Sequence, residues 1–401
     1  MTPTARHLVD EILEEIFLRL PTPAALARAS TASPRFRRII TERAFLRRFL
    51  ALHPPPLLGF AAGVGGFYPA QDPHPSAPLA RAIVDAADFT YSFVPKAKSW
   101  FGHWHPCDAR DGRLLLEASY RFDLETIPSH AVCDPLSRRY VVLPAIPEEM
   151  TIPQERLFEF RSILAPIAED EDETSFKVIF MANYKSKLLT YVFSSVTLQW
   201  CVAASISWGS LGTADPYLAR PLCNNLHSFF YWDADWRGKL FVLDTCRREF
   251  YIANFAAGNH RQLLNKRGHG MIRSSIAVGT DRALEMFSLI GDYGSDALYG
   301  LYHTTQQNDG ESFNEWQLKN VAALPRGCLY DTVGATEGFM VLRGYQEPHH
   351  GLPGNRDVED LFSLDLKTSE LTKVCRVAPQ DPTRRVCSYF GFPPSLSKPS
   401  L

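Results

Sequence analysis

Residues 132–140 read Val-Cys-Asp-Pro-Leu-Ser-Arg-Arg-Tyr, and the same pattern returns three times along the chain. The other copies, which align with the first without gaps, are Val192–Trp200, Val242–Phe250 and Ser363–Leu371. The third position of each copy is Asp or Ser, whose side chain can bond the backbone two residues on and start a turn. The ninth position is Tyr, Trp, Phe or Leu, which we expect to pack on the returning strand. Each copy therefore predicts a β-hairpin.

The spacing of these copies predicts how the hairpins are organised. Their third positions, Asp134, Ser194, Asp244 and Asp365, are 60, 50 and 121 residues apart, and the longest interval has room for two units. A period of 50 to 60 residues made of short strands is typical of propeller blades, as in kelch-type repeats. Over residues 57–395 it predicts an all-β propeller of about six four-stranded blades. Ring closure should then pair Leu57–Phe60 with a strand near Ser388–Phe392.

The segments between the turns also favour sheet. Continuous β-branched and aromatic runs suit strands that are buried on both faces. These runs are Phe176–Met181, Leu188–Phe193, Phe229–Trp232 and Lys239–Leu243. Residues 53–80 are instead rich in Pro, Gly and Ala, which predicts a loop-rich entry with one short strand at Leu57–Phe60.

The first fifty residues have a helical periodicity. Apolar residues recur every three or four positions opposite a run of acidic residues, which predicts an amphipathic helix ended by Pro21. Its apolar residues are Leu8, Ile12, Leu13, Ile16, Phe17 and Leu20. Thr22-Pro23 and Ser33-Pro34 each place a capping hydroxyl before a proline and predict two further helix starts, and a last helix opens at Thr41-Glu42. So small a unit cannot bury all this apolar surface, and part of it should meet another domain or a partner.

The string Leu8–Pro21, Leu-Val-Asp-Glu-Ile-Leu-Glu-Glu-Ile-Phe-Leu-Arg-Leu-Pro, resembles the opening of an F-box. Ala25–Arg28 and Arg35–Ile40 resemble its second and third helices. The resemblance covers residues 8 to about 50 and implies a small all-α domain of three to four helices that docks on a Skp-family adaptor, and through it on a cullin. The positions that match the F-box core or adaptor face are Leu8, Ile12, Leu13, Ile16, Leu20, Pro21, Leu26, Phe36 and Ile40.

Four positions depart from the usual F-box pattern. Val9 stands in place of the proline that usually follows the first leucine, and Phe36 in place of a tryptophan. Ala32 and Ser33 stand in place of valine and cysteine, which makes the packing there smaller. Phe36 keeps an aromatic anchor.

A second, more diffuse resemblance spans most of the remaining chain. Asp134–Pro144 is similar to the Asp/Asn-Pro…Arg…Leu-Pro strand pair of the plant F-box-associated domains, and Leu198–Trp200 and Glu315-Trp316 are similar to that family's strand ends. The two resemblances together imply a plant-type F-box protein with a kelch-like C-terminal domain. We expect an F-box at residues 1–53, the associated domain at 54–395 and a tail at 396–401.

The implied function is substrate recognition in a Skp-cullin-F-box ubiquitin ligase, with the helices on the adaptor and the propeller on a protein target. Such a subunit works by holding reactants together and performs no chemistry of its own. The alternative is a propeller scaffold or glycan-binding protein whose N-terminal helices merely cap it. An unrelated helical cap would show no affinity for an adaptor.

Composition excludes several other classes. Hydrophobic residues make up 45% and charged residues 21%, as in ordinary soluble proteins. The net charge of −2 gives no whole-chain attraction to nucleic acid or to an anionic membrane, and no apolar run reaches the ~18 residues of a bilayer span. Six arginines crowd residues 35–48, where solvated helix faces are the simpler explanation than a nucleic-acid patch. The eight cysteines are scattered, which predicts eight free thiols in a cytoplasmic or nuclear protein.

Few residues are candidates for chemistry. His103-x-His105-x-Cys107 could converge on a metal if it lay on a strand, but a fourth ligand is not evident and a loop explains it equally well. The acidic run Glu169–Glu173 and the pair His349-His350 suit solvated loops. The chain has no Gly-x-Ser-x-Gly, phosphate-loop or His-Glu-x-x-His motif. We therefore expect no catalytic residue, no metal and no cofactor.

Overall fold

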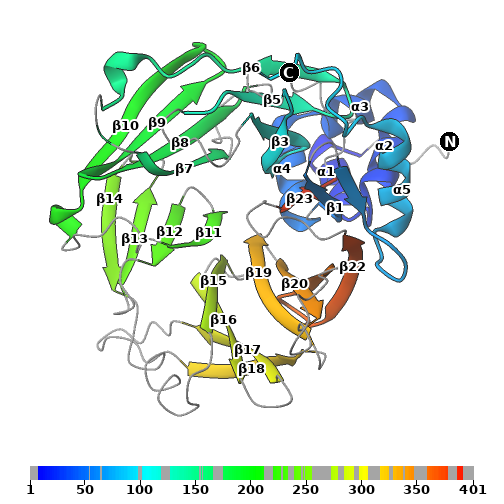
Figure 1. The fold of residues 1–401 in the computed structure, drawn as a ribbon. Helices are drawn as coiled ribbons and strands as arrows, with labels where there is room; N and C mark the ends of the chain where they lie inside the picture. Colours follow the sequence, from blue (N-terminus) through cyan, green and yellow to red (C-terminus); the bar gives the residue numbers. More distant parts are fainter. Residues whose placement is uncertain are drawn as a thin grey trace.

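The chain opens with helices and continues almost entirely as antiparallel sheet (Figure 1). This computed structural model describes residues 8–391 apart from internal gaps. The gaps are 54, 64–65, 98–101, 119–126, 153–154, 156, 166–174, 212–219, 227–228, 234–238, 245–246, 248, 255–271, 279–283, 293–297, 306–316, 325–327, 337–338, 347–358 and 378–385.

Four helices precede the first strand. They are α1 (Asp10–Leu18), α2 (Pro23–Thr31), α3 (Pro34–Ile40) and α4 (Arg43–Leu52). Both predicted hydroxyl caps are confirmed, because Thr22 Oγ1 accepts from the Ala25 N–H at 3.1 Å and Ser33 Oγ accepts from the Arg35 N–H at 3.2 Å. The four helices share one apolar core, which contains Leu13, Phe17, Leu18, Leu26, Ile39, Ile40, Phe45, Leu46 and Phe49.

In the part of the chain that the structure describes, six antiparallel sheets follow the helices, and five of them are four-stranded meanders of consecutive strands. The first two contain β3 (His105–Arg110), β4 (Arg113–Glu117), β5 (His130–Asp134) and β6 (Arg139–Val142), and then β7 (Leu157–Leu164), β8 (Lys177–Tyr184), β9 (Lys187–Ser194) and β10 (Gln199–Ser207). The third contains β11 (Arg220–Leu226), β12 (Phe229–Asp233), β13 (Lys239–Asp244) and β14 (Glu249–Asn254). The last two contain β15 (Ile272–Val278), β16 (Leu284–Asp292), β17 (Leu298–Thr305) and β18 (Gln317–Ala323), and then β19 (Cys328–Thr336), β20 (Phe339–Gln346), β21 (Glu359–Asp365) and β22 (Leu371–Val377).

The sixth sheet joins the two ends of the β region. Its order is β2 (Gly66–Pro69), β1 (Leu57–Ala62), β23 (Val386–Phe390). Leu57 pairs with Phe390 and Phe60 with Ser388, so the predicted pairing of these segments is confirmed. The sheet has three strands among the described residues, one fewer than the four expected.

Contacts between elements run from each sheet to the next. Along the chain they join β23 to β3, β3 to β7, β10 to β14, β11 to β15, β15 to β19, and finally β22 back to β2. Figure 1 shows the sheets arranged one after another around the molecule in this order. Polar contacts bridge them too: Asp108 accepts the Leu164 N–H at 2.7 Å, and the Tyr389 hydroxyl donates to the Gly112 carbonyl at 3.2 Å.

The four predicted hairpins join β5 to β6, β9 to β10, β13 to β14 and β21 to β22. The third-position side chain starts the turn as predicted: the Asp134 carboxylate accepts the Leu136 N–H at 2.9 Å, and the Asp365 carboxylate accepts the Lys367 N–H at 2.8 Å. The longest interval between copies holds the sheet β15–β18, in agreement with the room for two units.

Two details of the hairpins differ from expectation. The seventh residue is in the left-handed region in three copies, at Arg138, Leu198 and Ser369, which the aligned residue types did not reveal. The ninth residue packs inward at Trp200, whose ring lies 5.4 Å from that of Phe193. Tyr140 instead is 41% exposed, although both residues lie on the outermost strands of their sheets.

The short strand predicted at Leu57–Phe60 is confirmed as part of β1, but the expectation that the rest of residues 57–80 is loop-rich is wrong for much of its length. The segment holds the hairpin β1–β2 and the start of a fifth helix, α5 (Ala77–Ala86). Ala80 on α5 is fully buried in a cluster with Phe60 and Ala70. Alanine is small enough to bring the helix close to the sheet, but it gives little hydrophobic pattern by which to predict it.

The β1–β2 hairpin yields a stability prediction at Gly59. This residue has φ +151°, and a Cβ placed on it would lie 2.3 Å from the Tyr68 carbonyl oxygen. We expect Gly59→Ala to lower the free energy of unfolding by about 2 kcal/mol through strain and overpacking. Gly209→Ala is the matched control, since nothing lies within 4 Å of its Cβ position, and it should stay within about 0.5 kcal/mol of the parent. Equal urea midpoints for the two variants would contradict the prediction.

Candidate protein-docking surface

Helix α1 has one buried and one exposed apolar face. Leu13 and Phe17 are 3% and 5% exposed and belong to the helical core. Val9, Ile12 and Ile16 are 53%, 48% and 44% exposed. Ile12 and Ile16 are four residues apart on one face of α1, and Val9 is the N-cap residue three positions before Ile12; the three are called here the α1 stripe. A contiguous exposed apolar surface of this kind is typical of a protein–protein interaction site.

The buried face of α1 is held by aromatic packing. The Phe17 ring meets the Phe36 ring edge-on at 5.1 Å and the Phe45 ring at 6.4 Å. Phe36 thus fills the aromatic position of α3 by packing against α1, as expected of an aromatic anchor. Because these contacts use only the inner face, they leave the α1 stripe exposed.

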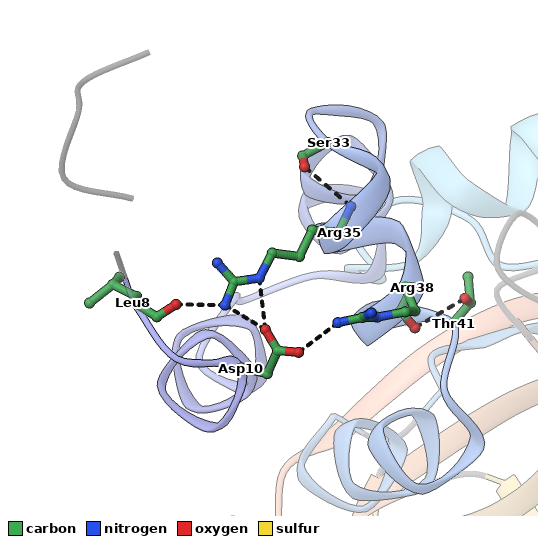
Figure 2. A network of polar contacts seen from close by, with 6 residues as sticks. All are labelled: Leu8, Asp10, Ser33, Arg35, Arg38 and Thr41. Atoms are coloured by element: carbon green, nitrogen blue, oxygen red, sulfur yellow. Dashed lines mark hydrogen bonds and ion pairs between the residues drawn. The ribbon is translucent and has the colours of Figure 1, made fainter. Parts of the chain in front are cut away.

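Ion pairs fix the start of α1 to α3 (Figure 2). The Asp10 carboxylate accepts from Arg35 Nε and from Arg38 Nη2, both at 2.7 Å. Arg35 Nη2 also donates to the Leu8 carbonyl at 2.6 Å. Asp10 lies in the first turn of α1, where a negative charge also interacts favourably with the helix dipole.

A second set of contacts fixes α1 to α4. Arg48 donates to Glu14 at 3.0 Å and to Glu15 at 2.6 Å, and the His53 ring Nε2 lies 2.8 Å from the Leu18 carbonyl. Three of the six clustered arginines therefore make ion pairs within the helical unit. Of the others, Arg37 is exposed, and the side chains of Arg43 and Arg47 lie outside the described residues. This use of the charges agrees with the expectation of solvated helix faces.

The structure divides the nine predicted F-box positions into three environments, a division that the sequence did not provide. Leu13, Leu26 and Ile40 are buried in the core, and Leu8, Leu20 and Phe36 are partly buried against it. Ile12, Ile16 and Pro21 are exposed. Sequence reasoning missed Val9, the most exposed member of the α1 stripe, because it was treated only as a departure from the usual proline.

The candidate metal residues of the sequence do not converge. His103 is exposed ahead of β3, His105 is half-buried and Cys107 is buried. Cys107 instead lies near Glu117 and His130. The acidic run at 169–173 and the pair His349-His350 lie outside the described residues, as do Glu315-Trp316.

The cysteines with described side chains are free thiols, namely Cys107, Cys133, Cys201, Cys328, Cys375 and Cys387. The side chains of Cys223 and Cys246 are outside the described residues. Within the described part of the chain, no helix has the length and apolar character needed to cross a membrane.

In this chain a short helical unit with an exposed apolar stripe precedes a large β region. The family model of the F-box domain matches residues 6–48, which contain α1, α2, α3 and the start of α4. The chain thus carries an F-box domain, and this match supports its assignment as an F-box protein. No curated protein sequence matches the chain.

Solved structures share only a remote similarity with the chain. A prolyl endopeptidase is 13% identical, with 82% of this chain and 47% of that chain covered and a TM-score of 0.33. A post-proline cleaving enzyme from Rickettsia typhi is 11% identical, with coverage of 69% and 37% and a TM-score of 0.33. An α-L-arabinofuranosidase of Fusarium graminearum is 11% identical, with coverage of 68% and 91% and a TM-score of 0.35. The chain spans less than half the length of the first two.

The ion pairs of Asp10 predict how the stability of the helical unit depends on pH. Hydrogen bonds from Arg35 hold the pKa of Asp10 below its usual value of 3.8. A lowered pKa in the folded state stabilises the fold above the unfolded-state pKa, and this stabilisation is lost as the pH falls below 3.8 through the folded value. The unfolding free energy of the parent should therefore exceed that of Asp10→Asn at pH 5 to 7, and the difference should shrink on acidification.

The matched control is Glu11→Gln, because Glu11 is exposed on the same helix and has no ion pair among the described side chains. Urea unfolding followed by circular dichroism from pH 2 to 7 gives all three curves. A difference between the parent and Asp10→Asn that does not change with pH would contradict the prediction.

Proposed function

We propose that this chain is the substrate-recognition subunit of a Skp-cullin-F-box ubiquitin ligase. The F-box domain at residues 6–48 suggests this role, because such domains typically bind Skp-family adaptors. The observation that carries the proposal is the α1 stripe, which remains exposed although the opposite face of α1 is packed in the helical core and Asp10, Glu14 and Glu15 are ion-paired. A partner protein that binds an apolar surface of this kind removes it from water, which is favourable.

The docking step depends on burying Ile12 and Ile16. Fully burying an isoleucine is worth about 1.5–3 kcal/mol relative to full exposure, and each of these side chains is close to half exposed. Together they would supply roughly 1.5–3 kcal/mol toward binding, with Val9 adding to the same stripe. The ion pairs made by Asp10 and Arg48 hold α1 rigid, which reduces the entropy lost on docking.

The second part of the proposal concerns the β region. We infer that the six sheets are the blades of a kelch-like propeller of the plant F-box-associated type, within residues 54–395, and that this domain binds a protein target. The contacts from each sheet to the next, the β1–β23 pairing and the four equivalent hairpins support this assignment.

The chain would act without catalysis of its own. The F-box, within residues 1–53, would attach it through the adaptor to a cullin, and the β region would hold the target near the transferring enzyme. Tethering raises the effective concentration of the target, which is sufficient for this role. Such a subunit would work in the cytoplasm or nucleus, where cysteines stay reduced.

Substitution of Ile16 tests the docking step. We expect Ile16→Asp to weaken binding to a purified Skp-family adaptor at least ~100-fold, because a charge without a partner is costly in a buried interface. Ile16→Leu should bind like the parent. The melting of Ile16→Asp should match the parent's, because the side chain is already 44% exposed in the free chain. Isothermal titration and a melting curve on each variant measure both quantities.

Two controls separate docking from folding. Val84→Asp changes a side chain of similar exposure (45%) on α5, outside the helical unit, and should leave adaptor binding unchanged. Deletion of residues 1–53 should abolish binding and leave the β region folded. If the parent shows no adaptor binding, or if Ile16→Asp binds normally, the ligase proposal is wrong. If the deletion unfolds the whole chain, the helices are a structural cap and the scaffold or glycan-binding alternative is favoured.

A further inference from the structure

A cluster of three potential metal ligands lies on the first four-stranded sheet. Cys107 is on β3, Glu117 is the last residue of β4 and His130 is the first residue of β5. Glu117 and His130 are directly paired in the strand register, so their side chains share a face. The thiol sulphur, a carboxylate oxygen and an imidazole nitrogen all lie within 4.8 Å of one another.

The distances around this cluster are close to those that a tetrahedral ion requires. His130 Nε2 is 3.8 Å from Glu117 Oε2 and 2.9 Å from Ser162 Oγ, and Cys107 Sγ is 3.4 Å from the same hydroxyl. Zinc bonds of about 2.0 Å to nitrogen or oxygen and 2.3 Å to sulphur place neighbouring tetrahedral ligands roughly 3.3–3.7 Å apart. Side-chain movements of less than about 1 Å would bring the three ligands to that geometry.

The orientation of His130 matches that of a metal ligand. Its Nδ1 lies 2.9 Å from the Pro128 carbonyl, which can only accept a hydrogen bond, so Nδ1 carries the proton. In the neutral ring this leaves the lone pair on Nε2, which faces Glu117 and Ser162. Metal-ligating histidines almost always donate their other N–H to a carbonyl or carboxylate in this way.

Burial favours a structural role and argues against catalysis. Ser162, Cys107 and His130 are buried, so no substrate can reach the Ser162 hydroxyl beside His130. Glu117, with 16% of its side chain exposed, is the ligand on the side of solvent. Ser162 lies on β7 of the next sheet, so a bound ion would sit where the two sheets meet.

We propose that Cys107, Glu117 and His130 form a zinc site between the first two four-stranded sheets, with Ser162 or a water molecule as the fourth ligand. A thiolate and an imidazole favour zinc over magnesium or calcium, which prefer an all-oxygen set. Binding deprotonates the Cys107 thiol, and the proton goes to solvent. The ion stabilises the packing of β3, β4 and β5 against β7.

The sequence pattern indicated Cys107 as a metal ligand but paired it with the wrong residues. It joined Cys107 to His103 and His105 by their alternate spacing, but the ligands that lie near Cys107 come from the following two strands. A bulge between Pro106 and Asp108 shifts the register at Cys107, which simple alternation does not anticipate.

The experiment uses the full chain, purified without chelator, with zinc as the probe. Elemental analysis after dialysis against trace zinc should give one zinc per chain, and chelation should lower the melting temperature. Cobalt in place of zinc should produce a thiolate-to-metal charge-transfer band. Cys107→Ser and Glu117→Gln should each weaken zinc binding about 100-fold or more, since even changes beyond the direct ligands cost 10- to 100-fold.

Cys133→Ser is the matched control, because Cys133 is also a buried thiol on the same sheet but lies outside the cluster. It should bind zinc like the parent. Absence of zinc in the parent, or zinc retained equally by Cys107→Ser, Glu117→Gln and Cys133→Ser, would overturn the proposal and leave a hydrogen-bonded network. If Cys107→Ser fails to fold, zinc should still protect Cys107 of the parent from alkylation, and an unchanged alkylation rate overturns the proposal. None of these readouts involves an adaptor, so they stand apart from the ligase proposal.

Discussion

The pairing of β1 with β23 is the interaction on which the arrangement of the β region depends. Every other described sheet forms between strands that follow one another in the chain, so short turns are enough to build it. Among the described strands, the β1–β23 pair, with Leu57 opposite Phe390, is the ladder that joins strands from the two ends of the β region. Without β23, one edge of β1 would present unpaired backbone groups, and β3 would lose the strand of this sheet with which it makes most of its contacts.

The helical unit satisfies a different constraint, because α1 must hold its own domain together and keep an apolar face free. Phe17 and Leu13 do the first with only the inner face of the helix. The charged residues do the rest: Asp10 and Arg48 attach α1 to α3 and α4 without covering Ile12 or Ile16. Polar contacts at the ends and sides of α1 thus leave its exposed stripe available.

Features decided by local chemistry could be predicted from the sequence. The hydroxyls of Thr22 and Ser33 cap helices, and the carboxylate of Asp134 starts a turn, because each acts on backbone within three residues. Features decided by distant packing could not. Helix α5 has too plain an apolar pattern, and the grouping of Cys107 with His130 depends on strand register and a bulge. The exposed face of α1 is an intermediate case. The periodicity of its apolar residues predicts the helix, but which of these residues are exposed is decided by how α3 and α4 pack against α1.

The β1–β23 ladder also has a consequence for synthesis of the protein on the ribosome. The contacts within the helical unit are close in sequence, so this unit can fold as soon as it leaves the exit tunnel. Strand β1, which follows it directly, has to wait for β23 until nearly the whole chain has been translated. During that interval the nascent chain carries a folded helical unit with its exposed α1 stripe, while one edge of β1 is still unpaired. A chain that ended before β23 would therefore keep the α1 stripe but lack the strand that pairs with β1.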